Sequence, residues 1–272
     1  MDAMKPTSTF VAGSGDGYEQ VMGRWSKRLA APFLDFAGVA DAERVLDAGC
    51  GTGSLTFSLA GRMDGGWIDA VDLSEIYVGH AAERNADPRI SFAAADICAL
   101  PYDAATFDRV LSMLVLHFVP EPQRAVNELR RVARPGATVA ATVWDVRGGF
   151  VANRMFYDTA AAVDAEGARR RARNFTRPMT RPGELASSWR EAGFIDIREA
   201  SLMIRMEFSC FDDYWAPYSG KDGPGAEYMA TLDDAARQRA GALVREAYLD
   251  GEADGPRSYA AVAWAVSGRV PG

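Results

Sequence analysis

The chain has 272 residues, of which 48% are hydrophobic and 25% are charged, and its formal net charge is −7. This is the profile of a soluble globular protein with one large domain, or with one domain and an insertion, and it supports a substantial core. Because the net charge is negative, the molecule repels nucleic acid and anionic membranes at long range, so neither is expected as a bulk partner.

The cysteines and the first residues bear on the compartment. Cys50, Cys98 and Cys210 are far apart and lack the close pairing of a disulfide framework or a metal site, which fits a reducing cytoplasm. Residues 1–17 contain neither a signal-like apolar core nor an apolar run of spanning length. We therefore expect a cytoplasmic protein without a membrane span and with a loose first segment.

Helical spacing of apolar residues follows the first segment. Residues 18–39 fit one or two helices, with an interruption expected at Pro32. From Arg44 onward, short apolar runs alternate with helical patterns. The predicted strands are 44–49, 67–73, 90–96, 107–116 and 137–145, and the predicted helices between them are 55–63, 75–86 and 123–133. Apolar strands separated by helices predict a doubly wound parallel sheet covered on both faces.

The alternation ends after Asp145. Residues 147–180 are predicted to form a helical insertion, followed by a helix at 183–193. Two long strand-like runs, 194–208 and 258–269, flank a predicted helix at 233–249. The pair is long enough to add an antiparallel edge to the parallel sheet.

A glycine cluster joins the first strand to its helix. Gly49, Gly51 and Gly53 stand at alternate positions, which is more glycine than an ordinary turn needs. The dinucleotide spacing G-x-G-x-x-G is not met, because Leu55 stands near the place of the third glycine. Asp47 is also a poor neighbour for a pyrophosphate and would suit a cationic ligand or a hydrogen-bond donor. The loop therefore indicates a different nucleotide-bearing cofactor.

This stretch, "DAGCGTG" at 47–53, resembles the first motif of the class I S-adenosylmethionine-dependent methyltransferases. The resemblance continues in order through 70–74, 94–119 and 128–145. This order of motifs is similar to that of the group that includes the ubiquinone and menaquinone C-methyltransferases. It implies a Rossmann-like methyltransferase fold with a seven-stranded, mostly parallel sheet. It also implies S-adenosyl-L-methionine as cofactor, S-adenosyl-L-homocysteine as product, and a small-molecule acceptor methylated on oxygen, carbon or nitrogen.

The resemblance also divides the chain. It implies an N-terminal helical lid at 1–40, a cofactor-binding half at 41–146, the insertion 147–180 as a substrate cap, and a C-terminal half at 181–272 that completes the sheet. We expect the lid residues Tyr18 and Arg24 to reach the methionine carboxylate of the cofactor, although packing on the core is an even alternative.

Two strand ends carry the expected nucleoside contacts. Asp72 ends the second strand about twenty residues after the glycine loop, where a carboxylate can accept hydrogen bonds from both ribose hydroxyls. Leu73 would then lie against the adenine. The resemblance assigns the adenine amine to Asp96 and the adenine ring to Ile97; a surface carboxylate at a strand end is the alternative.

The remaining cofactor contacts surround the methyl group. The resemblance places Gly49, Gly51 and Gly53 under the amino-acid moiety, with Asp47 nearby. Leu114 and its neighbour Val115 would line the sulfonium, and ordinary core packing is an equal alternative. No metal site, catalytic triad or phosphate loop is expected.

His117 stands just past the fourth strand, where ligands of open α/β sheets bind. With an ordinary pKa of ~6.5, this side chain can remove a proton from the acceptor, which makes it the candidate catalytic base. The alternative is a histidine in the same segment without a chemical role.

Six aromatic residues in the insertion and in 210–220 are candidates for an apolar substrate pocket, with ordinary packing as the alternative: Phe150, Phe156, Tyr157, Tyr214, Trp215 and Tyr218. The cluster Arg169–Arg177 is either a solvated helix face, a site for an anionic substrate group, or an RNA contact. The rival functions are therefore an RNA or protein methyltransferase and an inactive cofactor-binding regulator. A homodimer is left open.

Overall fold

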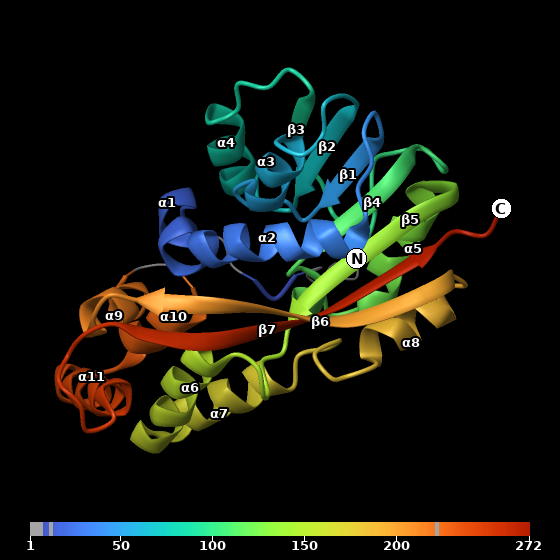
Figure 1. The fold of residues 1–272 in the computed structure, drawn as a ribbon. Helices are drawn as coiled ribbons and strands as arrows, with labels where there is room; N and C mark the ends of the chain where they lie inside the picture. Colours follow the sequence, from blue (N-terminus) through green and yellow to red (C-terminus); the bar gives the residue numbers. More distant parts are fainter. Residues whose placement is uncertain (1–7, 11–12, 221–222) are drawn as a thin grey trace, which may run out of the picture.

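The computed structural model describes residues 8–10, 13–220 and 223–272. Its centre is one seven-stranded sheet with the strand order β3-β2-β1-β4-β5-β7-β6 (Figure 1). The strands are β1 Arg44–Ala48, β2 Trp67–Asp72, β3 Ile90–Ala94, β4 Phe107–Met113, β5 Ala133–Trp144, β6 Ile195–Phe208 and β7 Arg257–Arg269. The predicted doubly wound, mostly parallel sheet is confirmed.

The pairing of the strands creates a crevice. β1 is parallel to both β2 and β4, and the chain winds outward from β1 in both directions. A reversal of strand order of this kind leaves a crevice at the carboxyl ends of the two central strands. β7 is antiparallel to both β5 and β6, so the predicted antiparallel edge is also confirmed.

Alternate residues of the central strands feed two separate cores. Val45 packs with α2 (Arg24–Ala37) and α3 (Ser54–Ala60) on one face, whereas Leu46 packs with α5 (Pro122–Val132) and α8 (Glu184–Glu191) on the other. This alternation follows from the two-residue period of a strand. The sheet is therefore covered on both faces, which leaves the carboxyl ends of its central strands as the place for a ligand.

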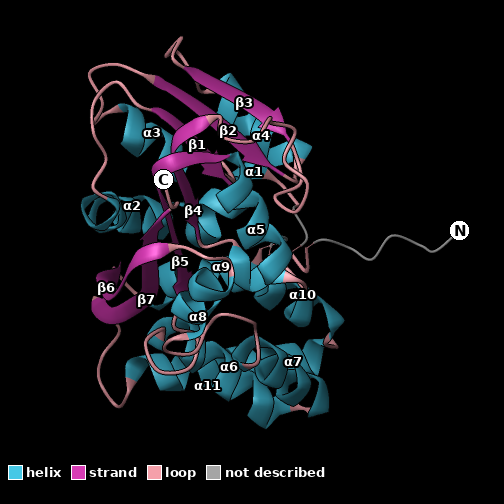
Figure 2. Ribbon diagram, turned by 90° about the vertical axis from the view of Figure 1, so that its right-hand side faces the viewer, coloured by secondary structure: helices cyan, strands magenta, loops and turns pink. Residues whose placement is uncertain are grey.

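The remaining helices complete the molecule. α4 (Glu75–Glu83) follows β2, and α1 (Gly15–Tyr18) and a π-helical turn at Glu19–Gly23 lead into α2. The others are α6 Val151–Val163, α7 Ala165–Phe175, α9 Phe211–Ser219, α10 Pro224–Thr231 and α11 Asp234–Leu249. α6, α7 and α11 gather at one end of the molecule (Figure 2).

Two local expectations are wrong. The leading helix is not interrupted at Pro32, because α2 continues through it to Ala37 with Leu29, Phe33 and Leu34 buried on one face. Tertiary packing of that face outweighs the cost of one proline in the helix. In addition, β5 begins at Ala133, four residues before the predicted strand 137–145 and at the last residue of the predicted helix 123–133.

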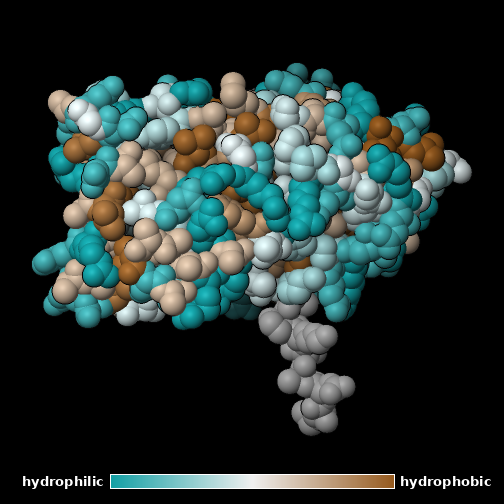
Figure 3. All heavy atoms as spheres, turned by 90° about the horizontal axis from the view of Figure 1, so that it is seen from below, coloured by the Kyte–Doolittle hydropathy of each residue, from teal (hydrophilic) through white to brown (hydrophobic). Residues whose placement is uncertain are grey.

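The surface is mixed on the face seen from below in Figure 1. Hydrophobic residues lie scattered among hydrophilic ones there (Figure 3). Within the described part of the chain, no helix has both the length and the apolar character needed to cross a membrane.

Candidate functional site

A cavity of about 560 Å³ lies at the carboxyl ends of β1, β2 and β4. Its volume falls in the range of small-ligand sites. Its wall includes seven of the residues predicted from the sequence: Tyr18, Gly49, Gly51, Asp72, Leu73, Asp96 and Ile97, with Leu114 as an eighth. We refer to it as the glycine-loop cavity.

The glycine loop needs its glycines for conformation. Gly49, Gly51 and Gly53 have φ values of +86°, +54° and +90°, a region that other residues adopt only at a cost. A Cβ at Gly49 would lie 2.2 Å from Cγ2 of Val115, which lines the same cavity. The loop backbone therefore approaches the end of β4 more closely than any side chain would allow.

Gly49→Ala tests this close approach. Gly38 also has a positive φ, +66°, but a Cβ there meets nothing within 4 Å, so Gly38→Ala is a matched control for backbone strain alone. We expect Gly49→Ala to lower the free energy of unfolding by about 1–3 kcal/mol more than Gly38→Ala does, because of overpacking. Urea denaturation measures both; equal losses would show that Val115 does not crowd this position.

Asp72 connects the end of β2 to the loop. Its Oδ2 accepts a hydrogen bond from the Gly51 amide at 2.9 Å, and its Oδ1 accepts one from the Ser74 amide at 2.9 Å. Burial raises the pKa of Asp72, and the hydrogen bonds from the Ser74 and Gly51 amides oppose that rise. The carboxylate is thus held in one orientation on the cavity wall, beside Leu73, which is 51% exposed.

Asp96 and Ile97 form the next part of the wall, in the turn after β3. The Oδ1 of Asp96 accepts a hydrogen bond from the Cys98 amide at 2.8 Å. Ile97 is 8% exposed. A fixed carboxylate next to an apolar side chain can accept from an amine and contact a ring, so this pair suits a purine.

Asp47 lies beneath the loop and does not line the cavity. It is 0% exposed, its Oδ2 accepts from Thr56 Oγ1 at 2.6 Å, and its Oδ1 has no partner among the described residues. Burial raises the pKa of Asp47 to about 7, although the Thr56 hydrogen bond opposes this. Asp47 therefore carries a proton over much of the range in which other aspartates are ionised.

The N-terminal segment lies against the loop. Thr52 Oγ1 donates to Glu19 Oε1 at 2.5 Å, and the ring of Tyr18 lies 5.0 Å from that of Tyr77 on α4. Burial raises the pKa of Tyr18 to about 12, so its hydroxyl stays protonated and can donate. Tyr77 was not among the residues expected from the sequence, where its position in the first turn of the helix after β2 could have indicated it.

Arg24 lies elsewhere. Its Nη1 is 2.9 Å from Oδ1 of Asp213, and its guanidinium lies over the rings of Trp25 and Phe208. Arg24 does not line the glycine-loop cavity, because the helical turn that brings Tyr18 to the loop directs Arg24 toward α9 and β6. The expected contact with a cofactor carboxylate is thus not supported for Arg24.

A second cavity, of about 140 Å³, adjoins the first, and we call it the apolar cavity. Both are lined by Phe10, Tyr18, Tyr77, Leu114 and Phe118. Leu114 has φ +66°, which is a strained conformation for leucine. Its backbone amide donates a hydrogen bond to the Thr142 carbonyl at 2.7 Å, which helps to hold this conformation. Strain of this kind, placed between two cavities, is typical of a functional position.

His117 lies in a short 3-10 helix, Leu116–Phe118, and lines the apolar cavity. It is 3% exposed, and its Nδ1 has no partner within the described part of the chain. Burial, together with the charge of Arg177, lowers the pKa of His117 well below 6.5. The imidazole is therefore neutral at physiological pH, and the lowered pKa makes it a weaker base than a free histidine.

Four of the six candidate aromatic residues line the apolar cavity: Phe150, Tyr157, Tyr214 and Tyr218. The other two pack elsewhere. Phe156 stacks on Tyr218 at 4.0 Å between ring centres, and Trp215 stacks on Phe211 at 5.7 Å.

Comparisons with known proteins agree with this geometry. Residues 46–141 match the family model for a methyltransferase domain. The malonyl-acyl-carrier-protein O-methyltransferase of Erwinia pyrifoliae is 44% identical over 106 residues, which cover 39% of this chain and 39% of that protein. The chloroplastic 2-methyl-6-phytyl-1,4-hydroquinone methyltransferase 2 of Oryza sativa is 31% identical over 144 residues, covering 52% of this chain and 41% of that protein.

The chain thus matches about two fifths of the length of these relatives. Among solved structures, phosphoethanolamine N-methyltransferase 2 of Haemonchus contortus in complex with S-adenosyl-L-methionine superposes with a TM-score of 0.58 at 15% identity. The match covers 96% of this chain and 61% of that chain. At 15% identity, this structural similarity supports the fold alone.

Proposed function

We propose that this chain, whose residues 46–141 match a methyltransferase domain, is a class I methyltransferase that transfers the methyl group of S-adenosyl-L-methionine to a small-molecule acceptor. The observation that carries the proposal is the Asp72 carboxylate, fixed by the amides of Gly51 and Ser74 at the wall of the glycine-loop cavity. A fixed carboxylate at the end of the second strand is suited to two ribose hydroxyls.

The residues present fit this cofactor along the whole cavity. In the proposed arrangement Asp72 binds the ribose, Asp96 and Ile97 bind the adenine, and Leu73 covers its other side. The loop of Gly49, Gly51 and Gly53 lies under the amino-acid moiety, and Leu114 lies near the sulfonium. Of the two expected lid residues, Tyr18 and Arg24, only Tyr18 lines the cavity, so Tyr18 alone is proposed as the lid residue at the loop.

When bound, the cofactor supplies a methyl group that is already activated by the sulfonium, so the protein has mainly to align the reactants and exclude water. Phe10, Tyr18 and Tyr77 are suited to exclude water, because they line the cavity and contact one another. His117 is suited to remove a proton from an acceptor in the apolar cavity, because it is buried and neutral and its Nδ1 has no partner among the residues that the structure describes.

Isothermal titration calorimetry of the full chain tests the cofactor assignment. We expect saturable binding of S-adenosyl-L-methionine and no binding of NADH, since the glycine loop does not have the dinucleotide spacing. Binding of NADH alone by the folded protein would contradict the proposal.

Asp72→Ala is expected to weaken S-adenosyl-L-methionine binding by about 1–3 kcal/mol, roughly 5- to 150-fold in Kd, through unpaired ribose hydroxyls. The matched control is Asp69→Ala on the same strand, where the carboxylate pairs with Arg44 at 3.1 Å outside the cavity. The control should bind the cofactor as the wild type does. An unchanged Kd in Asp72→Ala would remove Asp72 from the ribose site.

A further inference from the structure

A third cavity, of about 420 Å³, continues beyond the apolar cavity, and we call it the basic cavity. Its wall contains Arg170, Arg173 and Arg177. It shares His117, Phe118, Tyr157, Asn174, Arg177 and Pro224 with the apolar cavity. Because Phe118 lines all three cavities, the glycine-loop, apolar and basic cavities are neighbours around one ring.

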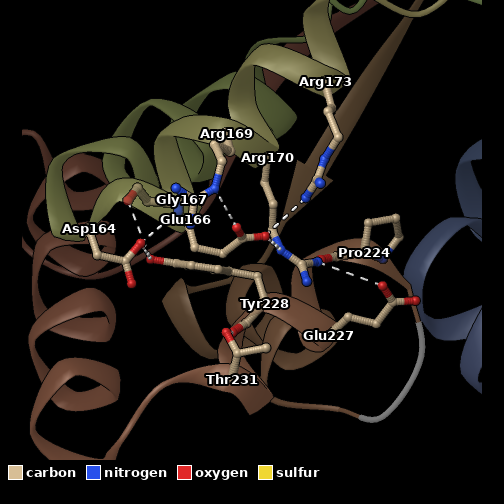
Figure 4. Close-up of polar contacts among 11 residues, drawn as sticks. Asp164, Glu166, Gly167, Arg169, Arg170, Arg173, Pro224, Glu227, Tyr228 and Thr231 are labelled. Atoms are coloured by element: carbon tan, nitrogen blue, oxygen red, sulfur yellow. Dashed lines mark hydrogen bonds and ion pairs between the residues drawn. The ribbon is translucent and has the colours of Figure 1, made fainter.

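Most arginines of the cluster Arg169–Arg177 already have acidic partners (Figure 4). The ion pairs are Arg169–Glu166 at 2.9 Å, Arg170–Glu166 at 2.9 Å, Arg170–Glu227 at 3.7 Å, Arg173–Glu166 at 3.0 Å and Arg171–Asp158 at 2.5 Å. Each of these four arginines is already in an ion pair within the protein, and they share the three carboxylates Glu166, Glu227 and Asp158. Pairing of this kind weakens their attraction for an RNA backbone. For these four residues the helix-face interpretation is the better one.

Arg177 is different, because no described carboxylate lies within ion-pair distance of it. Its Nε donates to Oδ1 of Asn174 at 3.2 Å, and its guanidinium carbon lies 4.4 Å from the ring centre of Phe118. Asn174 is in turn fixed by donating to Oδ1 of Asn153 at 2.9 Å. The guanidinium is therefore held in one orientation between two cavities, with a charge that no carboxylate of the described residues pairs with.

Such an arrangement costs stability unless a ligand supplies the anion. Burial lowers the pKa of Arg177, yet a guanidinium remains protonated at neutral pH, so the charge stays in place. His117 adds an independent observation. It is 3% exposed, lines the same two cavities, and has an unpartnered Nδ1 among the described residues. The buried His117 and the half-buried Arg177 thus face the same space, both with hydrogen-bonding capacity that the described residues do not use.

We propose that Arg177 binds a carboxylate of the methyl acceptor, so that the substrate class is a small apolar acid whose hydrocarbon part occupies the apolar cavity. This inference rests on the proposed methyltransferase function. Aromatic side chains such as Trp144, Phe150 and Tyr218 surround the space for the hydrocarbon part. A carboxylate anchored at Arg177 would hold the acceptor beside His117. Only the ring of Phe118 would then lie between the acceptor and the glycine-loop cavity.

Arg177 carries one positive charge, which a singly charged carboxylate neutralises. Its planar guanidinium can donate to both oxygens of a carboxylate. Glu166 is shared by Arg169, Arg170 and Arg173, so the surrounding arginines outnumber their acidic partners, and a phosphate is the competing anion that the test must include.

Phenylacetate and phenylacetamide have similar shapes and differ in charge, so they are suitable probes. We expect calorimetry on the full chain, with and without S-adenosyl-L-homocysteine, to show phenylacetate binding at least about 10-fold tighter than phenylacetamide, which is about 1.4 kcal/mol. Arg177→Gln should abolish this preference, and Arg177→Lys should retain part of it. The matched control Arg169→Gln removes an arginine of the same cluster that lies outside the three cavities, and should retain it fully.

Three results would overturn the inference: no preference for phenylacetate in the wild type, an undiminished preference in folded Arg177→Gln, or tighter binding of phenyl phosphate than of phenylacetate. Titration of the same samples with S-adenosyl-L-methionine separates the two proposals. Cofactor binding without a carboxylate preference contradicts only the acid substrate, whereas an Arg177-dependent preference without cofactor binding contradicts the methyltransferase function.

Discussion

His117→Gln is expected to lower kcat by about 10²–10⁴-fold and to leave the Kd for S-adenosyl-L-methionine unchanged, because glutamine cannot take up the acceptor's proton. The imidazole is buried and lines the cavity proposed for the acceptor, outside the wall that binds the cofactor. The rate of S-adenosyl-L-homocysteine release at saturating S-adenosyl-L-methionine, with the same small-molecule metabolite extract for each protein, compares their turnover, and calorimetry measures the Kd.

The other histidine of the chain, His80, provides the control. It lies on α4 and contacts Arg84, so His80→Gln should keep wild-type turnover. The pH profile gives a second readout. Since burial and Arg177 lower the pKa of His117, the base stays unprotonated on acidification, and wild-type kcat should not fall as the pH passes through 6.5. Full activity of His117→Gln would remove His117 from the chemistry.

Asp47→Asn is expected to change the pH dependence of stability. The carboxyl of Asp47 has its ordinary pKa of 3.8 in the unfolded chain and a pKa of about 7 in the native protein. Between these pH values Asp47 is ionised in the unfolded state and protonated in the native state. Native stability is therefore lost as the pH rises from about 4 to about 7, by on the order of 4 kcal/mol. Asparagine does not titrate, and it can still accept from Thr56.

Urea denaturation at pH 5 and pH 8 measures this difference. Relative to the wild type, Asp47→Asn should be more stable at pH 8 than at pH 5. Using the difference between the two proteins cancels the other titrating groups, including Asp72. If the stability difference between wild type and variant is the same at both pH values, the native pKa of Asp47 is not raised.

Local patterns were sufficient to predict the sheet. The run 44–49 is apolar and ends in glycines, and the structure forms β1 and the loop there. The two late runs were long and close in sequence, and they form the antiparallel pair β6 and β7. The segment 211–219 was not recognised as the helix α9, because Pro217 and the clustered aromatic residues mask a helical period.

Residues at strand ends were also predictable, because the topology fixes where those ends meet. Asp72, Asp96 and Leu114 all line the cavity for that reason. Residues that depend on tertiary packing were not. Arg24 is paired with Asp213, nearly two hundred residues away, and Arg177 differs from its neighbouring arginines only because Glu166 and Asp158 reach the others. No spacing rule along the chain reveals such pairing.

The most direct measurement follows a labelled methyl group. Full-length protein is incubated with methyl-labelled S-adenosyl-L-methionine and a cell extract separated into small-molecule, protein and RNA fractions. The account predicts label in an organic-solvent-soluble product of the small-molecule fraction, with matching release of S-adenosyl-L-homocysteine. Label in the protein or RNA fraction, or cofactor binding without transfer to any fraction, would contradict it.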